Sequence, residues 1–208
     1  MRKIYLACCI QFFLLTCIIA QDKDFEGIIT YKTDYSANPD TAKVHQLNLL
    51  FGDSLRVYFR GNLYKQHYTN SRWIQEVTYL PSYNKYFMVF QKFDTLYQVD
   101  CSKADDNYTV TVDPGDRKNI MGYDCIKLVM QGEKTKKTYY FAPELSLINV
   151  DYSRHKIGGY DLFMENARSV YLYLRVENQA GVQEFKAVKI EKRALPNSVF
   201  ELLPLPKK

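Results

Sequence analysis

Cysteine and histidine can bind metals or act in catalysis, and both functions require a particular spacing of these residues. Cys101 and Cys125 stand apart, and neither has a second cysteine or a histidine within a few residues. A structural zinc site needs four ligands, usually in closely spaced pairs. A cysteine nucleophile needs a partner base, and His45, His67 and His155 stand in no recognisable relation to either sulfur. The spacing therefore predicts neither a metal site nor a cysteine hydrolase.

The N-terminal segment decides which compartment these cysteines meet. Two basic residues precede an uncharged run from Ile4 to Ala20, and a charged, polar segment follows. This pattern predicts a secretory signal peptide over residues 1–20, with cleavage before Gln21. Two alternatives stay open. The run is close to the minimum length of a membrane-spanning helix, and the sequence LLTC, which ends at Cys17, resembles a bacterial lipobox.

Cleavage would leave Cys101 and Cys125 as the only cysteines of the exported chain. In an oxidising compartment an even pair of cysteines usually forms a disulfide. A bridge here would close a loop of about 25 residues and stabilise the fold by roughly 3 kcal/mol. The sequence therefore predicts a disulfide between Cys101 and Cys125.

The rest of the chain, residues 21–208, is long enough for one domain with a substantial core. The whole chain carries a formal charge of +5, and its Lys and Arg residues are interleaved with Asp and Glu. This distribution offers no basic patch for nucleic acid. The sequence also lacks a nucleophile elbow, a zinc-protease motif, a phosphate-binding loop and a dinucleotide fingerprint. We therefore expect a non-enzymatic protein that uses no cofactor.

The abundance of aromatic residues, with 18 Tyr and 12 Phe, favours strands. Gly52-Asp53 and Gly61-Asn62 are dipeptides typical of tight turns between strands. One helical turn is expected within 36–43, and no long amphipathic helix is found. Short connections at about ten-residue spacing predict an all-β antiparallel meander, as a barrel, a half-barrel or a sandwich. The predicted strands are 25–35, 47–51, 55–60, 63–68, 72–80, 85–91, 95–100, 107–112, 120–131, 136–141, 160–164, 171–177 and 182–191.

Two predicted strands, 72–80 and 85–91, are apolar at odd and at even positions alike. A strand that is apolar on both faces must be covered on both. Two explanations stay open: these strands lie in the centre of a sandwich, or one of their faces lines an apolar groove for a ligand. The candidate lining residues of such a groove are Trp73, Tyr79, Met88 and Phe90.

Four short motifs carry a resemblance to known families. They are DFEGIITYK after the signal peptide, NIMGYDCIKLV in the centre, KTYYFAPEL after it, and the late ALPNSVFELLP. The chain resembles secreted Gram-negative bacterial families of unknown function, the GLPGLI type among them, which are related to the LolA-like lipoprotein-carrier fold. The resemblance implies a LolA-like antiparallel half-barrel or open barrel with little helix, whose concave face is exposed to the periplasm or the outer surface.

These observations predict an exported binding protein of the bacterial cell envelope, with a lipid or another hydrophobic ligand on the concave face. Aromatic rings supply contact area for such a ligand, and methionine supplies adaptability. The alternative is a structural or interaction module of the envelope that binds a protein partner and no small molecule. The amino-acid pattern alone does not separate the two.

Overall fold

The computed structural model describes residues 24–37, 41–93 and 95–202. Its strands form one antiparallel sheet in the order β6-β5-β4-β3-β2-β1-β11-β10-β9-β8-β7. Neighbours in the sheet are neighbours in the sequence except at the centre, where β1 pairs with β11. The strands are β1 (Gly27–Ser36), β2 (Ser54–Arg60), β3 (Leu63–Thr69), β4 (Ile74–Leu80), β5 (Lys85–Phe90), β6 (Leu96–Asp100), β7 (Thr109–Ile120), β8 (Tyr123–Gln131), β9 (Lys136–Ser146), β10 (Ser169–Asn178) and β11 (Gly181–Lys192).

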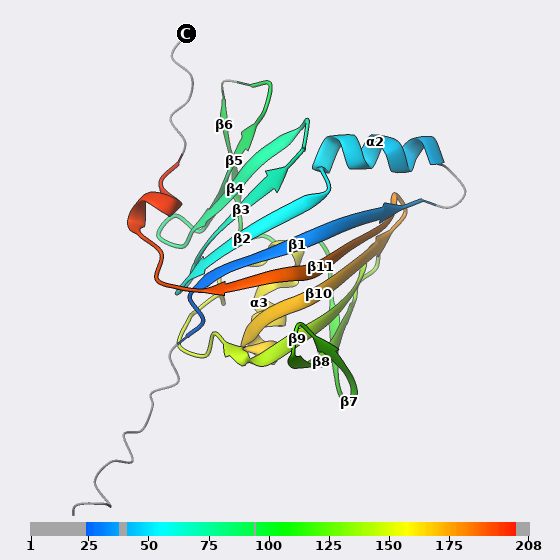
Figure 1. Ribbon diagram of the computed structural model, residues 1–208, viewed down its shortest axis with the longest axis vertical. Coiled ribbons are helices and arrows are strands. Elements are labelled where there is room, and N and C mark those ends of the chain that lie inside the picture. Colours follow the sequence, from blue (N-terminus) through cyan, green and yellow to red (C-terminus); the bar gives the residue numbers. More distant parts are fainter. Residues whose placement is uncertain (1–23, 38–40, 94, 203–208) are drawn as a thin grey trace, which may run out of the picture.

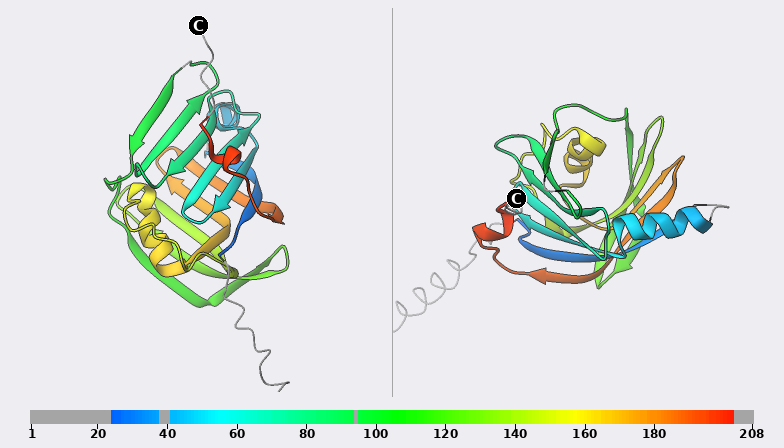
Figure 2. Two further views of the ribbon diagram at one scale, coloured as in Figure 1. Left: turned by 90° about the vertical axis from the view of Figure 1, so that its left-hand side faces the viewer. Right: turned by 90° about the horizontal axis from the view of Figure 1, so that it is seen from above.

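The sheet curls around a short helix, α3 (Tyr160–Ala167), which lies inside its concave face (Figures 1 and 2). A longer helix, α2 (Thr41–Phe51), lies at one end of the sheet (Figure 1). Two single turns of 3-10 helix complete the described elements, η1 (Ile157–Gly159) and η2 (Asn197–Phe200). The sheet is open, since β6 and β7 are its two edges. The prediction of an all-β antiparallel meander in open form is confirmed.

Alternation in β2 shows why the strands fold onto one face. Leu55, Val57 and Phe59 are buried, whereas Arg56 is exposed. A period of two places all three apolar side chains on the concave side. Gly61 then adopts a left-handed conformation with φ of 55°, and the chain returns as β3. The turn predicted at this glycine is confirmed.

The prediction of a strand over 47–51 is wrong, because these residues form the second half of α2. Val44, Leu47 and Phe51 are all half-buried, at the spacing i, i+3 and i+7 that marks one face of a helix. Leucine has a high helix propensity but also occurs in strands, so the leucines of this segment did not separate a helix from a strand. Tyr35 of β1 stacks on Phe51 at 6.1 Å between ring centroids, and this contact holds the helix end against the sheet.

The prediction of a strand over 160–164 is also wrong, because the segment lies in α3. Gly158 and Gly159 precede the helix, and both are in left-handed conformations that reverse the chain. Phe163 and Ala167, four residues apart, then point into the core. This helix fills the concave side of the curved sheet, so the sheet needs no second sheet over it.

A short C-terminal segment covers the convex side of β1, β2 and β3. Leu195 and Phe200 pack with Ile28 in a small apolar cluster, and the Arg60 guanidinium lies over the Phe200 ring at 4.8 Å. Beneath this cover Lys65 Nζ lies 2.7 Å from a Glu76 carboxylate oxygen, and both side chains are about nine-tenths buried. The convex face thus contains a buried ion pair.

Both cysteines are free and buried in the structure, so the predicted disulfide is not formed there. Cys101 follows the edge strand β6, and its backbone bonds to Asn84 and Lys156. Cys125 lies in β8, near the other edge, where its thiol faces the Tyr123 carbonyl. The sulfurs therefore have different surroundings, and a bridge requires Cβ atoms about 4 Å apart.

Thiol titration distinguishes the two arrangements. Burial raises the pKa of both the Cys101 and the Cys125 thiol to about 11, so neither is a reactive thiolate at neutral pH. A chain that begins at Gln21 is expected to show no fast-reacting thiol when folded and two in denaturant without reductant. Detection of no thiols in denaturant would mean that Cys101 and Cys125 are bridged in the protein.

The predicted signal peptide and the alternative lipidation at Cys17 lie outside the described residues, as do residues 38–40 of the helical turn expected within 36–43. Residues 41–43 of that segment begin α2. Within the described part of the chain, neither helix has the length and apolar character needed to cross a membrane.

Candidate functional site

The concave face contains a cavity that we call the inner cavity, with a volume of about 180 Å³. It lies between strands from the two halves of the sheet and the turn before α3. Its walls are aromatic and aliphatic, and besides the tyrosines its polar side chains are those of Gln66 and Lys137. The full lining is Val57, Phe59, Tyr64, Gln66, Tyr86, Lys137, Tyr139, Ile157, Gly158, Tyr160, Tyr171 and Leu174.

Lys137 is the charged group of the inner cavity. Its Nζ donates to the Gly158 carbonyl at 2.7 Å and lies 4.9 Å from the centroid of the Tyr108 ring. Burial lowers the pKa of Lys137, and the carboxylates of Asp105 and Asp106 oppose this shift. The ammonium is therefore positioned at the wall of an apolar cavity, where it can donate a hydrogen bond to the polar or anionic end of a ligand.

The floor of the inner cavity contains a chain of hydrogen bonds. A bond of 2.7 Å joins the Tyr64 hydroxyl to Nε2 of His155, and one of 2.5 Å joins the hydroxyls of Tyr64 and Tyr86. His155 is fully buried, and its Nδ1 has no hydrogen-bond partner among the described residues. Tyr79 and Tyr160 pack against the imidazole, with ring centroids 4.5 and 4.9 Å away. The histidine thus stands in a cage of tyrosines behind the cavity wall.

A second cavity, which we call the outer cavity, has a volume of about 290 Å³ and lies between α2 and the β10–β11 hairpin. Leu47 and Phe51 of the helix line one side of it, and Val176 of β10 lies opposite. The side chains of α2 whose burial is described are only half-buried or exposed, so its apolar face is incompletely covered. The full lining is Tyr35, Leu47, Phe51, Val176, Asn178, Ala180, Gly181, Val182 and Gln183.

Tyr68 of β3 interacts with lining residues of both cavities. Its hydroxyl donates to the side-chain oxygen of Gln66, which lines the inner cavity. Burial raises the pKa of Tyr68, and the nearby hydroxyls of Tyr171 and Tyr35 raise it further. Tyr171 lines the inner cavity and Tyr35 the outer one. The Tyr68 hydroxyl therefore lies near residues of both cavities.

The structure places the four candidate lining residues in two groups. Tyr79 is buried in the tyrosine cage. Alternation along β5 puts Met88 and Phe90 on the same face as Tyr86, and both are half-buried. Trp73 is 41 % exposed and packs on Phe90 at 5.3 Å. None of the four lines either cavity among the described residues. The cavity walls come mainly from β2, β3, β9, β10, β11 and α2, which sequence reasoning did not single out.

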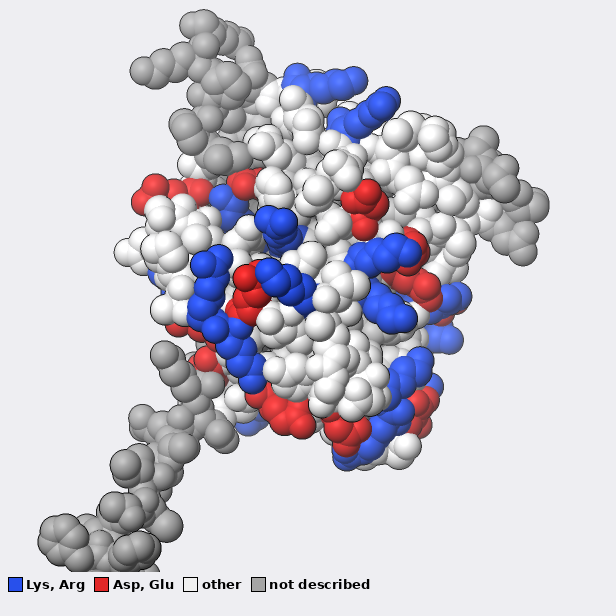
Figure 3. All heavy atoms as spheres, viewed as in Figure 1, with Lys and Arg blue, Asp and Glu red and all other residues white. Residues whose placement is uncertain are grey.

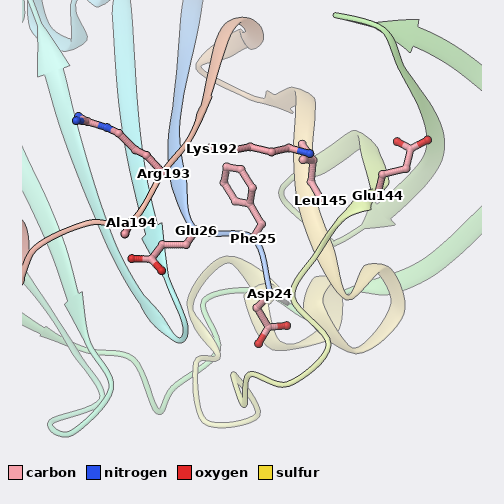
Figure 4. A pocket seen from close by; sticks show the side chains of 8 residues that line it. All are labelled: Asp24, Phe25, Glu26, Glu144, Leu145, Lys192, Arg193 and Ala194. Carbon is pink, nitrogen blue, oxygen red and sulfur yellow. The ribbon is translucent and has the colours of Figure 1, made fainter. Parts of the chain in front are cut away.

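Two further hollows do not have the largely apolar lining of the inner and outer cavities. A groove of about 250 Å³ lies beside residues 24–26, and in Figure 4 the side chains of Glu144 and Arg193 point in opposite directions along it. An open hollow of about 430 Å³ lies between residues 147–153 and α3, where Lys156 and Asp161 pair at 2.5 Å. Within the described residues, no three His, Cys, Asp or Glu side chains gather as metal ligands would.

Comparison with known proteins gives the following results. No family model matches the chain, and no curated protein matches it. Among solved structures it is similar to PNGF-II in its P21 crystal form, with a TM-score of 0.49 and 11 % identity over 85 % of this chain. The match covers 30 % of PNGF-II, so the chain spans less than a third of that protein.

Two smaller proteins are matched over most of their length. A LolA superfamily protein from Nitrosomonas europaea gives a TM-score of 0.41 at 10 % identity, covering 86 % of this chain and 91 % of that one. The lipoprotein LppX from Mycobacterium tuberculosis gives 0.32 at 11 %, covering 82 % and 89 %. All of these TM-scores are below 0.5, and the resemblance to GLPGLI-type families stays a prediction.

Proposed function

We propose that this protein is an exported, non-enzymatic binding protein that holds a slim apolar ligand, such as an acyl chain, on the concave face of its sheet. The observation that carries the proposal is the outer cavity, a largely apolar hollow between a half-buried helix and the β10–β11 hairpin. The predicted signal peptide supports export, since it would deliver the chain to the cell envelope.

The size and chemistry of the cavities favour this class of ligand. At about 290 Å³ the outer cavity is near the lower end of the roughly 300–1,000 Å³ that ligand pockets usually have. The inner cavity continues the same face and offers Lys137 and Gln66 as polar groups. A ligand with an apolar acyl chain and one polar end matches both cavities. A polar metabolite would instead place its polar groups against aromatic walls that offer few hydrogen-bond partners.

Filling the outer cavity should weaken binding. The variant Val176→Phe places an aromatic ring opposite Leu47 of α2, in space that the ligand would occupy. We expect the affinity for the neutral fluorescent probe N-phenyl-1-naphthylamine to fall about tenfold, since a tenfold change corresponds to roughly the transfer free energy of two methylenes. Probe titration by fluorescence measures this directly.

Val188→Phe is the matched control. Val188 lies on β11 and is 52 % exposed, so the same substitution there adds a ring to the solvent side. Its probe affinity should equal that of the wild type. Native mass spectrometry before and after organic extraction should also release an adduct of lipid mass from protein recovered from a bacterial host. A bare mass together with no probe uptake would overturn the proposal.

A further inference from the structure

We propose that the end of the sheet formed by the β3–β4 turn and the β5–β6 turn docks on the surface of an anionic lipid bilayer through an exposed aromatic patch. This patch consists of Trp73, Phe90, Phe93 and Tyr97. The docking surface is distinct from both cavities, and the proposal does not depend on a ligand in either of them.

The patch is a contiguous set of rings that the described part of the fold leaves uncovered. Trp73, Phe93 and Tyr97 are 41, 43 and 44 % exposed. Phe90 stands at their centre and makes edge-to-face contacts with Trp73 at 5.3 Å and with Tyr97 at 5.0 Å. Single exposed apolar residues are ordinary, whereas clustered ones usually mark an interaction surface.

The position of the patch suits a flat partner. The β5–β6 turn stands at the upper end of the molecule in Figure 1, beyond the other strand ends. The amides of Arg72 and Trp73 bond to the carbonyls of Leu49 and Leu50, which fixes the β3–β4 turn against the end of α2. Two turns and one helix end therefore meet at one end of the molecule, and a bilayer surface can contact all three together.

The basic residues beside the patch favour an anionic lipid surface over the apolar face of another protein as its partner. Arg72 and Lys92 flank the patch, and both are exposed. Neither has an acidic partner among the ion pairs of the described residues. Figure 3 shows basic groups at the upper end of the face in view. Asp94, which follows Phe93 in the same turn, lies outside the described residues. Aromatic rings beside exposed cations are typical of proteins that lie in the headgroup region of anionic membranes.

The chain offers a direct probe of this contact, because Trp73 is its single tryptophan. Vesicles of phosphatidylcholine with about 30 % phosphatidylglycerol supply the anionic surface. We expect the Trp73 emission to shift to the blue on addition of these vesicles, and the protein to sediment with them. Partitioning should be weaker with pure phosphatidylcholine and should fall as salt is raised.

Two variants test the two parts of the surface. Phe93→Ser removes one exposed ring and should lower the partition coefficient about tenfold, as loss of a buried aromatic side chain does. Lys92→Glu should lower it by a similar factor on anionic vesicles, since it removes an attraction and adds a repulsion. Tyr83→Ser is the matched control, because Tyr83 is 64 % exposed in the turn at the other end of β4. It should bind as the wild type does.

The possible outcomes separate this surface from the ligand site. Absence of both the blue shift and co-sedimentation would overturn the proposal. So would an equal loss in Tyr83→Ser, or a blue shift that follows protein concentration without vesicles, because that result assigns the patch to a second copy of the chain. Uptake of N-phenyl-1-naphthylamine should be unchanged in Phe93→Ser, so failure of the ligand site and failure of the docking surface give different results.

Discussion

Replacing Glu76 with Gln is expected to lower the free energy of unfolding by about 3 kcal/mol, the cost of breaking a buried ion pair from one side. Glu76 lies 2.7 Å from Lys65 Nζ, and their side chains are 10 and 8 % exposed. Lys65 also donates to the Glu201 carbonyl at 3.3 Å, beneath the C-terminal segment. The neutral amide would leave the ammonium buried without a counter-charge. Urea unfolding of both proteins at neutral pH measures the difference.

The pKa of Glu76 supports this expectation. Burial acts to raise it, but hydrogen bonds from His67 and Lys65 outweigh burial and lower the pKa of the carboxyl below its usual range. A depressed carboxyl pKa means that the stabilisation is present above the unfolded pKa and is lost as the pH falls through the folded one. The ion pair is therefore intact at neutral pH.

Two comparisons show whether the charge is responsible. The double variant Lys65→Met with Glu76→Leu removes both charges and should be close to the wild type in stability, since apolar replacements of buried pairs are often neutral or stabilising. Asp34→Asn breaks the exposed contact between Lys32 and Asp34 and should have little effect. A loss below about 1 kcal/mol in Glu76→Gln would show that the pair adds little.

Acidification from pH 6.5 to pH 4 is expected to cost about 3 kcal/mol of stability through His155 alone, at 1.36 kcal/mol per pH unit of separation between the folded and unfolded pKa. Burial lowers the pKa of His155 to about 4, against 6.5 for an unperturbed imidazole. Between these values the unfolded chain binds a proton that the folded chain excludes. The contribution of His155 to stability is therefore present above pH 6.5 and is lost as the pH falls toward 4.

The surroundings of His155 explain why the proton is excluded. The imidazole is fully buried and ringed by tyrosines, while the charges that influence it, Asp161 and Lys137, act in opposite directions. Denaturant unfolding at a series of pH values should show the loss in the wild type. In His155→Phe this part of the pH dependence should vanish, leaving only the contribution of the carboxylates.

His45→Phe is the control for this experiment, because His45 is exposed on α2. It should keep the pH dependence of the wild type. Equal slopes in wild type and His155→Phe between pH 6.5 and 4 would contradict the assignment, and so would a folded His155 pKa near 6.5 by NMR titration.

The sequence allowed most strands to be predicted, because alternation and turn residues are local signals. Gly61 starts a tight turn with positive φ, as expected from its dipeptide. Strand β7 was predicted to stop before Pro114, but it continues to Ile120 after a register shift between Asp113 and Arg117. Edge strands tolerate proline, and that β7 is an edge could not be deduced from its own residues.

The candidate site was less predictable, because it depends on residues brought together from distant strands. Apolar character on both faces of 72–80 and 85–91 did indicate covered strands, and Tyr79 is covered by the segment around His155. The spacing of Val44, Leu47 and Phe51 was the available signal for α2, and with it for the outer cavity. Lys137 gives no local sign of its role, since its burial results from the turn at Gly158.

The pairing of the first strand with the last has a consequence for how the chain is made. Within the described sheet, β1 to β6 and β7 to β11 are ladders of sequence neighbours, joined where β1 meets β11. The local hairpins can form early, but this long-range seam must wait for Gly181–Lys192, which are synthesised after every other strand of the described sheet. Until then the sheet lacks its centre. Under the export that we propose, this order would keep the sheet incomplete while the chain is threaded through a secretion channel.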